Sequence, residues 1–354
     1  MGTWDQLASL PLEIDRYELE GRELAFSEEF VRYTTLITLR GGGEEGVGED
    51  VVYDGLDHSS FQGAGPTLPL AGSYTLGSFA EKLSELDLFP DPPVRDVSRR
   101  YRRWAFESAA LDLGLRQAGR SLAEHLGREM EPLTYVVSMR LGNFGDDTPE
   151  TSERMLRVLE RYPGTRFKLD PTNTWSDALI EELAVSGAVD SLDLKGQYKG
   201  TPVDVETDPE LYRKLTEAFP DAWLEDPDIN DETRPVLEPV RDRITWDAPI
   251  HSVDDVLALE WEPRMVNIKP SRVGSLEELG RAYDFCAERG IGAYGGGQTE
   301  LGVGRDHIQY LAALFHPDTP NDVAPAGFNN PALADGMPSS PIHLKPAATG
   351  FRFG

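Results

Sequence analysis

The chain is poor in several residue types, and each shortage excludes a class of protein. Its 354 residues include one cysteine, Cys286, so no disulfide can form within the chain. We interpret Cys286, at helical spacing in RAYDFCAERG, as a buried core residue, and its isolation weakly favours a cytoplasmic location. No run of about eighteen apolar residues occurs, so no transmembrane helix is expected. The N-terminus lacks the basic start and apolar stretch of a signal peptide.

Cationic side chains are also scarce. The 34 Lys and Arg residues face 62 Asp and Glu residues, which gives a net charge of −28. This charge argues against nucleic acids and anionic membranes as partners, because both are themselves negative. We expect a strongly solvated surface, and only a few of these acids are needed to bind a metal. The length suits a barrel of about 250 residues with a smaller second domain.

The first 130 residues are predicted to form an α+β domain. Residues 13–60 have the pattern of strands, and the glycine-rich GGGEEG reads as a hairpin turn rather than a dinucleotide-binding loop. Residues 61–76 are expected to form a loop. Ser78, with Glu81 three positions later, is typical of a capping box at the start of a helix. A longer helix is predicted over residues 99–119.

Residues 131–326 have a different character, because short apolar runs alternate with amphipathic helical patterns. Eight alternations predict a parallel TIM-like (β/α) barrel, with an open doubly wound sheet as the structural rival. The last segment, 327–354, is expected to be an irregular tail that packs on the barrel or the first domain. Helix starts are predicted at Thr148, Asp208, Ser252 and Ser275. The eight predicted strands are TYVVSMRL, TRFKLD, VDSLDLK, AWLEDP, RITWDAP, MVNIKP, IGAYGG and NDVAP.

Charged residues stand at the C-terminal ends of five consecutive predicted strands, in the order Lys168, Asp193, Glu225, Asp247 and Lys269. The C-terminal strand ends of a barrel converge on one mouth, where barrel enzymes keep their active sites. Three close carboxylates repel one another, and a hard divalent cation such as Mg²⁺ relieves that repulsion.

Such a site suits removal of the proton alpha to a substrate carboxylate. The metal would stabilise the enediolate that forms, and a lysine beside it would act as the base. Arg166, two residues before Lys168, is predicted to face inward as a permanent cation. Asp226 follows Glu225 directly, and Lys195 lies two residues beyond Asp193. These positions are candidates for electrostatic or substrate-binding roles.

Together, RFKLD, SLDLK, WLEDP, TWDAP and NIKPSRVGSLEELGRAYDFCAERGIGAYGGGQTELGVGRD resemble the enolase superfamily, nearest its muconate-lactonizing and o-succinylbenzoate-synthase-like branch. The resemblance implies a modified (β/α)7β barrel with a capping domain, whose loops near residues 24–33 and 50–60 close over a small carboxylate substrate. It implies Mg²⁺, or Mn²⁺, bound by Asp193, Glu225 and Asp247. Lys168 and Lys269 would be the acid/base pair, Glu300 would lie near the mouth, and the chain would form a homo-oligomer.

Two positions depart from the family pattern, and alternatives stay open. Arg166 stands where the family often has lysine, and Lys195 stands where it usually has asparagine. Asp170 competes with Asp193 as the first metal ligand. The reaction after deprotonation is open among racemisation or epimerisation, cycloisomerisation and dehydration. Two rival hypotheses are a catalytically silent barrel that binds a metal or ligand, and a barrel outside this superfamily with structural ion pairs.

Overall fold

The computed structural model describes residues 1–26, 30–142, 149–201, 203–329 and 333–354. Its capping domain contains a three-stranded antiparallel sheet, in the order β2 (Arg16–Ala25), β3 (Val31–Gly41) and β4 (Glu44–Asp50). A smaller sheet pairs β1 (Pro11–Ile14) with β5 (Gly72–Thr75). The helices of this part are α1 (Thr3–Ala8), α2 (Gly55–Ala64), α3 (Leu76–Ser84), α4 (Ser98–Gln117) and α5 (Leu122–Leu126).

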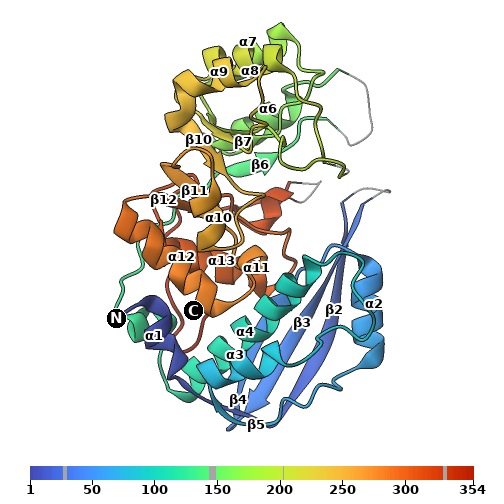
Figure 1. Ribbon diagram of the computed structural model, residues 1–354, viewed down its shortest axis with the longest axis vertical. Helices are drawn as coiled ribbons and strands as arrows, with labels where there is room; N and C mark the ends of the chain where they lie inside the picture. Colours follow the sequence, from blue (N-terminus) through green and yellow to red (C-terminus); the bar gives the residue numbers. More distant parts are fainter. Residues whose placement is uncertain (27–29, 143–148, 202, 330–332) are drawn as a thin grey trace.

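Helix α4 lies along strands β3 and β4, as Figure 1 shows, and glycines permit the close approach. A Cβ atom on Gly46 would lie 2.2 Å from the carbonyl oxygen of Ala109, and one on Gly48 would lie 1.9 Å from that of Ala105. Any side chain there would push the strand off the helix. The hairpin predicted at GGGEEG is confirmed, because Gly42 and Gly43 form the tight turn between β3 and β4.

The sequence misplaced two features of this domain. Residues 55–64 form helix α2, although its weak helix formers gave no periodic signal. Tertiary bonds hold this helix: His58 lies 2.8 Å from Thr35 Oγ1 through Nδ1 and 2.8 Å from the Val52 carbonyl through Nε2. Helix α3 begins at Leu76, because Thr75 is its N-cap, and Ser78 lies inside its first turn.

Seven parallel strands form the barrel sheet, and neighbours along the chain are neighbours in the sheet. The predicted TIM-like barrel with an N-terminal capping domain is therefore confirmed. The strands are β6 (Val137–Met139), β7 (Phe167–Leu169), β8 (Val189–Asp193), β9 (Trp223–Glu225), β10 (Ile244–Trp246), β11 (Met265–Ile268) and β12 (Gly292–Gly295).

The predicted eighth strand, NDVAP, is reduced to two isolated parallel bridges. Asn321 pairs with Tyr135, just before β6, and Asp322 pairs with Gly296, just after β12. The segment thus lies between the first and last strands of the barrel. The Asn321 side chain replaces part of the ladder: its Oδ1 accepts the Gly295 N–H at 2.6 Å, and its Nδ2 donates to the Thr134 carbonyl at 3.0 Å.

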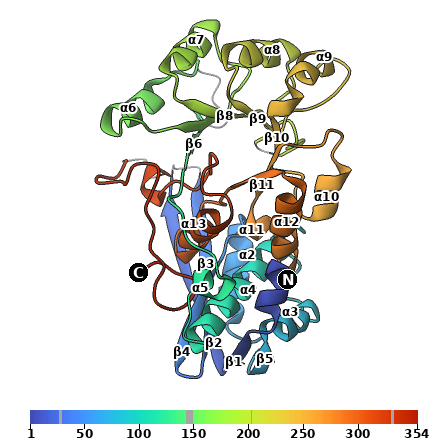
Figure 2. The same cartoon turned by 90° about the vertical axis from the view of Figure 1, so that its left-hand side faces the viewer.

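Helices follow the barrel strands, and α11, α12 and α13 lie on the side next to the capping domain (Figure 2). The predicted caps Asp208, Ser252 and Ser275 are confirmed. Thr148 lies outside the described residues, and the helix expected there begins at Glu153. The helices are α6 (Glu153–Arg161), α7 (Asp177–Ser186), α8 (Pro209–Ala218), α9 (Arg234–Leu237), η1 (Glu238–Arg243), α10 (Val253–Ala258), α11 (Pro270–Val273), α12 (Leu276–Arg289), α13 (Val303–Phe315) and η2 (Ala326–Asn329).

The C-terminal tail returns to the capping domain. The N–H of Phe351 donates to Asp112 Oδ1 at 2.8 Å, and Arg352 donates to Oδ2 of the same carboxylate at 2.7 Å. The N–H of Leu122 donates to the Gly350 carbonyl at 3.1 Å. Within the described ranges, no helix combines the length and apolar character needed to cross a membrane.

Candidate active site

Buried charged side chains converge at the C-terminal ends of the barrel strands. Lys168 lies in β7, while Asp193 and Glu225 end β8 and β9 and stand opposite each other in the ladder. Asp247 and Lys269 follow β10 and β11. All five are at most 7% exposed, so the predicted strand-end residues lie in the interior of the mouth.

Lys168 is the central cation of this group. Its Nζ donates to Glu225 Oε1 and lies 3.3 Å from Asp193 Oδ2 and 3.5 Å from Asp322 Oδ2. Burial alone would lower the pKa of Lys168, but the neighbouring carboxylates raise it well above its ordinary value. The other oxygen of Glu225 accepts a hydrogen bond from the Tyr294 hydroxyl.

Asp247 is held by a second set of donors. Lys269 Nζ donates to Asp247 Oδ2 at 2.8 Å, and Arg272 Nη1 donates to Oδ1 at 2.5 Å. The hydroxyl of Tyr198 also donates to Oδ2, at 3.0 Å. Although burial raises the pKa of Asp247, the two cations lower it below its ordinary value.

Asp226 has a left-handed backbone, with φ of 51°, which turns its side chain toward the next strand. Its two oxygens accept the N–H groups of Asp247 and Ala248, each at 2.8 Å. Oxygens of Asp193, Glu225 and Asp226 lie within 4.8 Å of one another, close enough to share a metal ion. Asp247 is not in that group, because Lys269 and Arg272 hold its carboxylate.

Lys195 also has a left-handed backbone, with φ of 55°. Its Nζ donates to Asp193 Oδ2 and lies 3.5 Å from Asp170 Oδ2. Asp170, the competing ligand considered from the sequence, is thus separated from Asp193 by an ammonium group. This arrangement places Lys195 in the mouth and leaves Asp193 in direct contact with both Lys168 and Lys195.

Carboxylates outnumber cations in this cluster. We define the mouth as six acids with four cations: Asp170, Asp193, Glu225, Asp226, Asp247 and Asp322 with Lys168, Lys195, Lys269 and Arg272. Fully ionised, the mouth has a formal charge of −2. Burial and the neighbouring acids raise the pKa of Glu225 well above its ordinary value and that of Asp226 to about 7. A divalent cation with oxygen ligands fits both the donor set and the excess charge.

Arg166 corrects one expectation, because it does not face the mouth. Its guanidinium pairs with Asp190 and the Gly187 carbonyl, and its side chain is 40% exposed. Arg166 lies one residue before β7 begins, so the strand alternation on which the prediction rested does not extend to it. Glu300 is buried in the loop after β12, where its Oε2 lies 3.0 Å from Arg305 Nη2.

Two mouth residues, and a tyrosine that contacts the mouth, were not singled out from the sequence. Asp322 stood in the predicted eighth strand, so its place in the barrel was an available signal. Arg272 lies three residues beyond Lys269, in the short helix α11. Tyr198 follows β8 in an irregular segment, and its spacing gave no signal.

The capping domain meets the barrel beside this mouth through two buried residues. Glu49 accepts the N–H groups of Leu301 at 2.7 Å and Gly304 at 2.8 Å, at the start of α13. Arg32 donates to the carbonyls of Gln298 at 2.9 Å and Thr299 at 3.2 Å. Burial and the charge of Glu300 raise the pKa of Glu49. These contacts hold the glycine-rich loop 296–304 against the capping domain.

A cavity of about 290 Å³ adjoins the mouth and takes its wall from both domains. It lies at the lower end of the size range of small-molecule sites. Its lining residues are Phe26, Phe30, Ser138, Met139, Arg140, Arg154, Asp170, Gly297, Thr299, Arg305 and Asp322.

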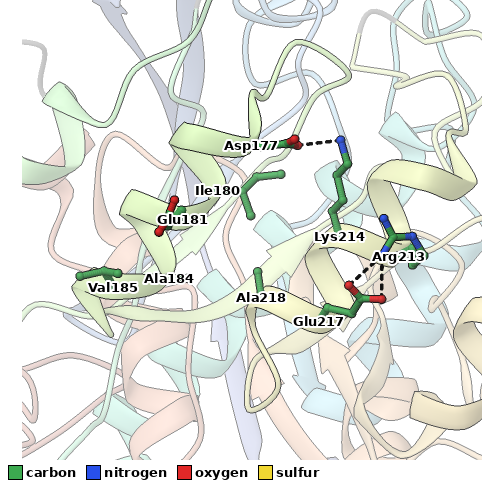
Figure 3. Close-up of a pocket in the computed structure, with 9 residues that line it drawn as sticks. All are labelled: Asp177, Ile180, Glu181, Ala184, Val185, Arg213, Lys214, Glu217 and Ala218. Carbon is green, nitrogen blue, oxygen red and sulfur yellow. Dashed lines mark hydrogen bonds and ion pairs between the residues drawn. The ribbon is translucent and has the colours of Figure 1, made fainter.

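A larger hollow, of about 640 Å³, lies on the outside of the barrel between α7 and α8 (Figure 3). Its cations are paired locally: Lys214 Nζ lies 2.6 Å from Asp177 Oδ1, and Arg213 Nη1 lies 2.7 Å from Glu217 Oε2. None of its lining residues belongs to the mouth, so we place the candidate site at the strand ends.

Solved structures share this fold. Muconate cycloisomerase from Pseudomonas fluorescens aligns with a TM-score of 0.66 and 19% identity, over 97% of this chain and 96% of that one. An enolase-superfamily member from Listeria innocua aligns with a TM-score of 0.62 and 21% identity, over 89% and 86% of the two chains. The fold is therefore that of the enolase superfamily, as the sequence motifs predicted.

Sequence relatives of known name include enzymes called o-succinylbenzoate synthase and N-succinylamino acid racemase. An o-succinylbenzoate synthase of Geobacillus stearothermophilus is 31% identical over 230 residues, 62% of this chain and 58% of the relative. An N-succinylamino acid racemase of Thermus thermophilus is 26% identical over 327 residues, 86% of this chain and 81% of the relative. The chain belongs to the DUF8230 family, described as a domain of unknown function, whose N-terminal model matches residues 5–125 and C-terminal model residues 129–330.

Proposed function

We propose that this protein is a divalent-metal enzyme that removes the proton alpha to a substrate carboxylate. The observation that carries the proposal is the mouth: six acids, four of them buried, face four cations, and two lysines stand on different strands around them. The relatives named o-succinylbenzoate synthase and N-succinylamino acid racemase support the same class of chemistry. The products of this chain follow from the fate of the deprotonated substrate, among racemisation, cycloisomerisation and dehydration.

We assign Asp193, Glu225 and Asp247 to the metal, which we expect to be Mg²⁺ or Mn²⁺. The carboxylates of Asp247 and Asp226 both already accept hydrogen bonds, so the choice of Asp247 follows the family pattern, although Asp226 lies closer to the first two. Its role is to hold the end of β10, and with it Asp247, in place. A bound dication supplies positive charge where negative charge develops on the substrate.

Lys168 and Lys269 would transfer the proton. Lys168 Nζ now carries a proton, because Glu225, Asp193 and Asp322 raise its pKa. A dication held by Asp193 and Glu225 would supply positive charge beside Lys168, and the Lys168 Nζ would hold or give up the transferred proton. Lys269 Nζ is oriented by Asp247 on the neighbouring strand, so the two amines can act from different sides of the substrate.

Isotope exchange tests this function. With Mg²⁺ in deuterated water, the protein is expected to wash out the alpha protons of N-succinylamino acids, followed by NMR. Metal binding without exchange across a panel of carboxylates would favour the silent metal-binding alternative. Lack of both metal binding and exchange would favour structural ion pairs alone.

Two amide variants test the ligand assignment. Asp247→Asn is expected to weaken Mg²⁺ binding, measured by calorimetry, more than Asp226→Asn does. The reverse order would transfer the ligand role to Asp226.

A homo-oligomer stays a prediction, which light scattering of the purified protein checks.

A further inference from the structure

The carboxylate of Asp193 already faces two ammonium groups. Its Oδ2 accepts a hydrogen bond from the Nζ of Lys195 and lies 3.3 Å from the Nζ of Lys168. Its Oδ1 accepts the backbone N–H of Lys195 at 3.2 Å. A dication bound to this carboxylate would lie close to both ammonium groups, and like charges at that spacing repel strongly in a buried site. One of the two lysines must therefore give way when a metal binds.

Of these two lysines, Lys195 has space to move. The Lys168 side chain is only 2% exposed and also bonds to Glu225. The Lys195 side chain is 16% exposed, and it has a second acidic neighbour in Asp170. Asp170 lines the cavity of about 290 Å³ beside the mouth, so the space around it is not filled by protein. We therefore expect Lys195 to withdraw from Asp193 more readily than Lys168.

Asp170 has an acceptor ready for the displaced ammonium group. Its Oδ2 already lies 3.5 Å from the Nζ of Lys195. Its Oδ1 is buried without a hydrogen-bond partner among the residues that the structure describes. An unsatisfied buried acceptor is costly, and a hydrogen bond from an ammonium group would satisfy it. A short movement of the Lys195 side chain would thus exchange Asp193 for Asp170 and leave the ammonium group paired.

The backbone of Lys195 is unusual for a lysine. Its φ of 55° lies in the left-handed region, which costs an ordinary residue about 1–2 kcal/mol. Asparagine enters this region more easily, because its short polar side chain can bond locally. The contacts of the ammonium group with Asp193 and Asp170 offset the cost for lysine. Lys195→Asn therefore removes the positive charge and still suits the backbone.

We propose that Lys195 is a built-in competitor of the metal, which holds Asp193 when no dication is bound and moves to Asp170 when one binds. Asp170 then controls the metal affinity without being a ligand. With six acids and four cations the mouth has a formal charge of −2, and removal of the Lys195 charge leaves −3. This inference rests on the proposed function, because it takes Asp193 as a metal ligand.

Calorimetric titration of the full chain with Mg²⁺ tests this role. Lys195→Asn removes the competing charge, so its Mg²⁺ affinity should rise about 10-fold. Asp170→Asn removes the acceptor for the displaced ammonium group, so its affinity should fall about 10-fold. Lys199→Asn is the matched control, because Lys199 is 52% exposed and pairs with Asp228 outside the mouth. The control should bind Mg²⁺ as the wild type does.

The double variant Lys195→Asn/Asp170→Asn separates an exchange of partners from a simple effect of charge. If Asp170 acts through Lys195, its replacement should cost less than about threefold once Lys195 is gone. An equal loss with and without Lys195 would overturn the proposal, because Asp170 would then act on the metal directly. An unchanged or weaker affinity in Lys195→Asn would overturn it too. Lys195→Gln provides a second variant if Lys195→Asn does not fold, which urea unfolding checks.

The two proposals fail differently, because the titration needs no substrate. If alpha-proton exchange is absent but the Asp170→Asn loss depends on Lys195, the deprotonation is refuted and the competition stands. If exchange occurs and neither single variant changes Mg²⁺ affinity, the competition is refuted and the deprotonation stands. If neither the wild type nor Lys195→Asn binds Mg²⁺ or Mn²⁺, both are refuted.

Discussion

The mouth and the capping domain both bury charged side chains, but they treat them differently. In the capping domain, the fully buried acids Glu49, Asp50, Glu107 and Asp112 each have donors of their own, and the last two pair with Arg103 and Arg352. Arg102 donates to Asp50 at 2.8 Å, Glu49 accepts N–H groups, and Arg32 donates to carbonyls. In the mouth the acids are in excess, and the pKa of Glu225 and of Asp226 is raised. Buried charge in which each group has its own donors or acceptors here builds structure, whereas an excess of acids around shared cations is available for a ligand.

The largest effect is expected at the mouth. Lys269→Ala removes a proton-transfer group, so the rate of alpha-proton exchange should fall roughly 10²- to 10⁴-fold. Exchange of substrate protons in deuterated water, followed by NMR, measures it. Lys199→Ala is the control, because Lys199 is 52% exposed and pairs with Asp228 outside the mouth. An unchanged exchange rate in Lys269→Ala would show that Lys269 does not transfer the proton.

The next effect should appear in the capping domain and only in stability. Arg102→Ala leaves Asp50 buried without its cation and removes the guanidinium from the faces of Phe61 and Phe89. Loss of one partner of a buried pair costs about 3–5 kcal/mol, measured by urea unfolding. Arg99→Ala, on the same helix but 43% exposed, should change stability little. A small loss in Arg102→Ala would contradict the structural role.

A third change distinguishes the two regions by metal binding. Glu225→Gln removes one of the acids in excess, so Mg²⁺ affinity measured by calorimetry should fall about 10- to 100-fold. Glu217→Gln, in the hollow between α7 and α8, should leave the affinity unchanged. If the wild type and both variants bound Mg²⁺ equally well, the buried acids of the mouth would have a structural role and would not bind the metal.

The smallest effect concerns the pH dependence of Glu49. Its pKa is raised in the folded protein, so the folded state holds the proton more tightly than the unfolded chain. The stabilisation from protonated Glu49 is complete below the unfolded pKa, about 4.3, and is lost as pH rises through the folded pKa. The wild type should therefore lose on the order of 1 kcal/mol relative to Glu49→Gln as pH rises through that window. Urea unfolding at several pH values measures the difference, and a pH-independent difference would count against the raised pKa.

The barrel could be predicted from the sequence because its strands appear as short apolar runs that end at a charged residue. Lys168, Asp193, Glu225, Asp247 and Lys269 all occupy strand ends in the barrel. Other features depend on three-dimensional detail that local patterns do not encode. Arg166 lies just before β7 and pairs with Asp190 instead of facing the mouth, and Arg272 contacts Asp247 because α11 begins directly after Lys269.

The capping domain was harder to predict for the same reason. Helix α2 has little amphipathic pattern and depends on the bonds of His58 to β3 and to Val52. The contact between Glu49 and the start of α13 could not be predicted from the local sequence, because it joins residues about 250 positions apart.

That long-range contact bears on how the chain can be divided. The two family models meet near residue 127, yet the start of α13 takes its acceptor from Glu49 in the other half. Cutting the chain at the seam between the models would strip the amides of Leu301, Gly302 and Gly304 of their partner and free the loop that lines the cavity. The two halves are therefore separate in sequence but interdependent in folding, and neither is expected to serve as a minimal working fragment.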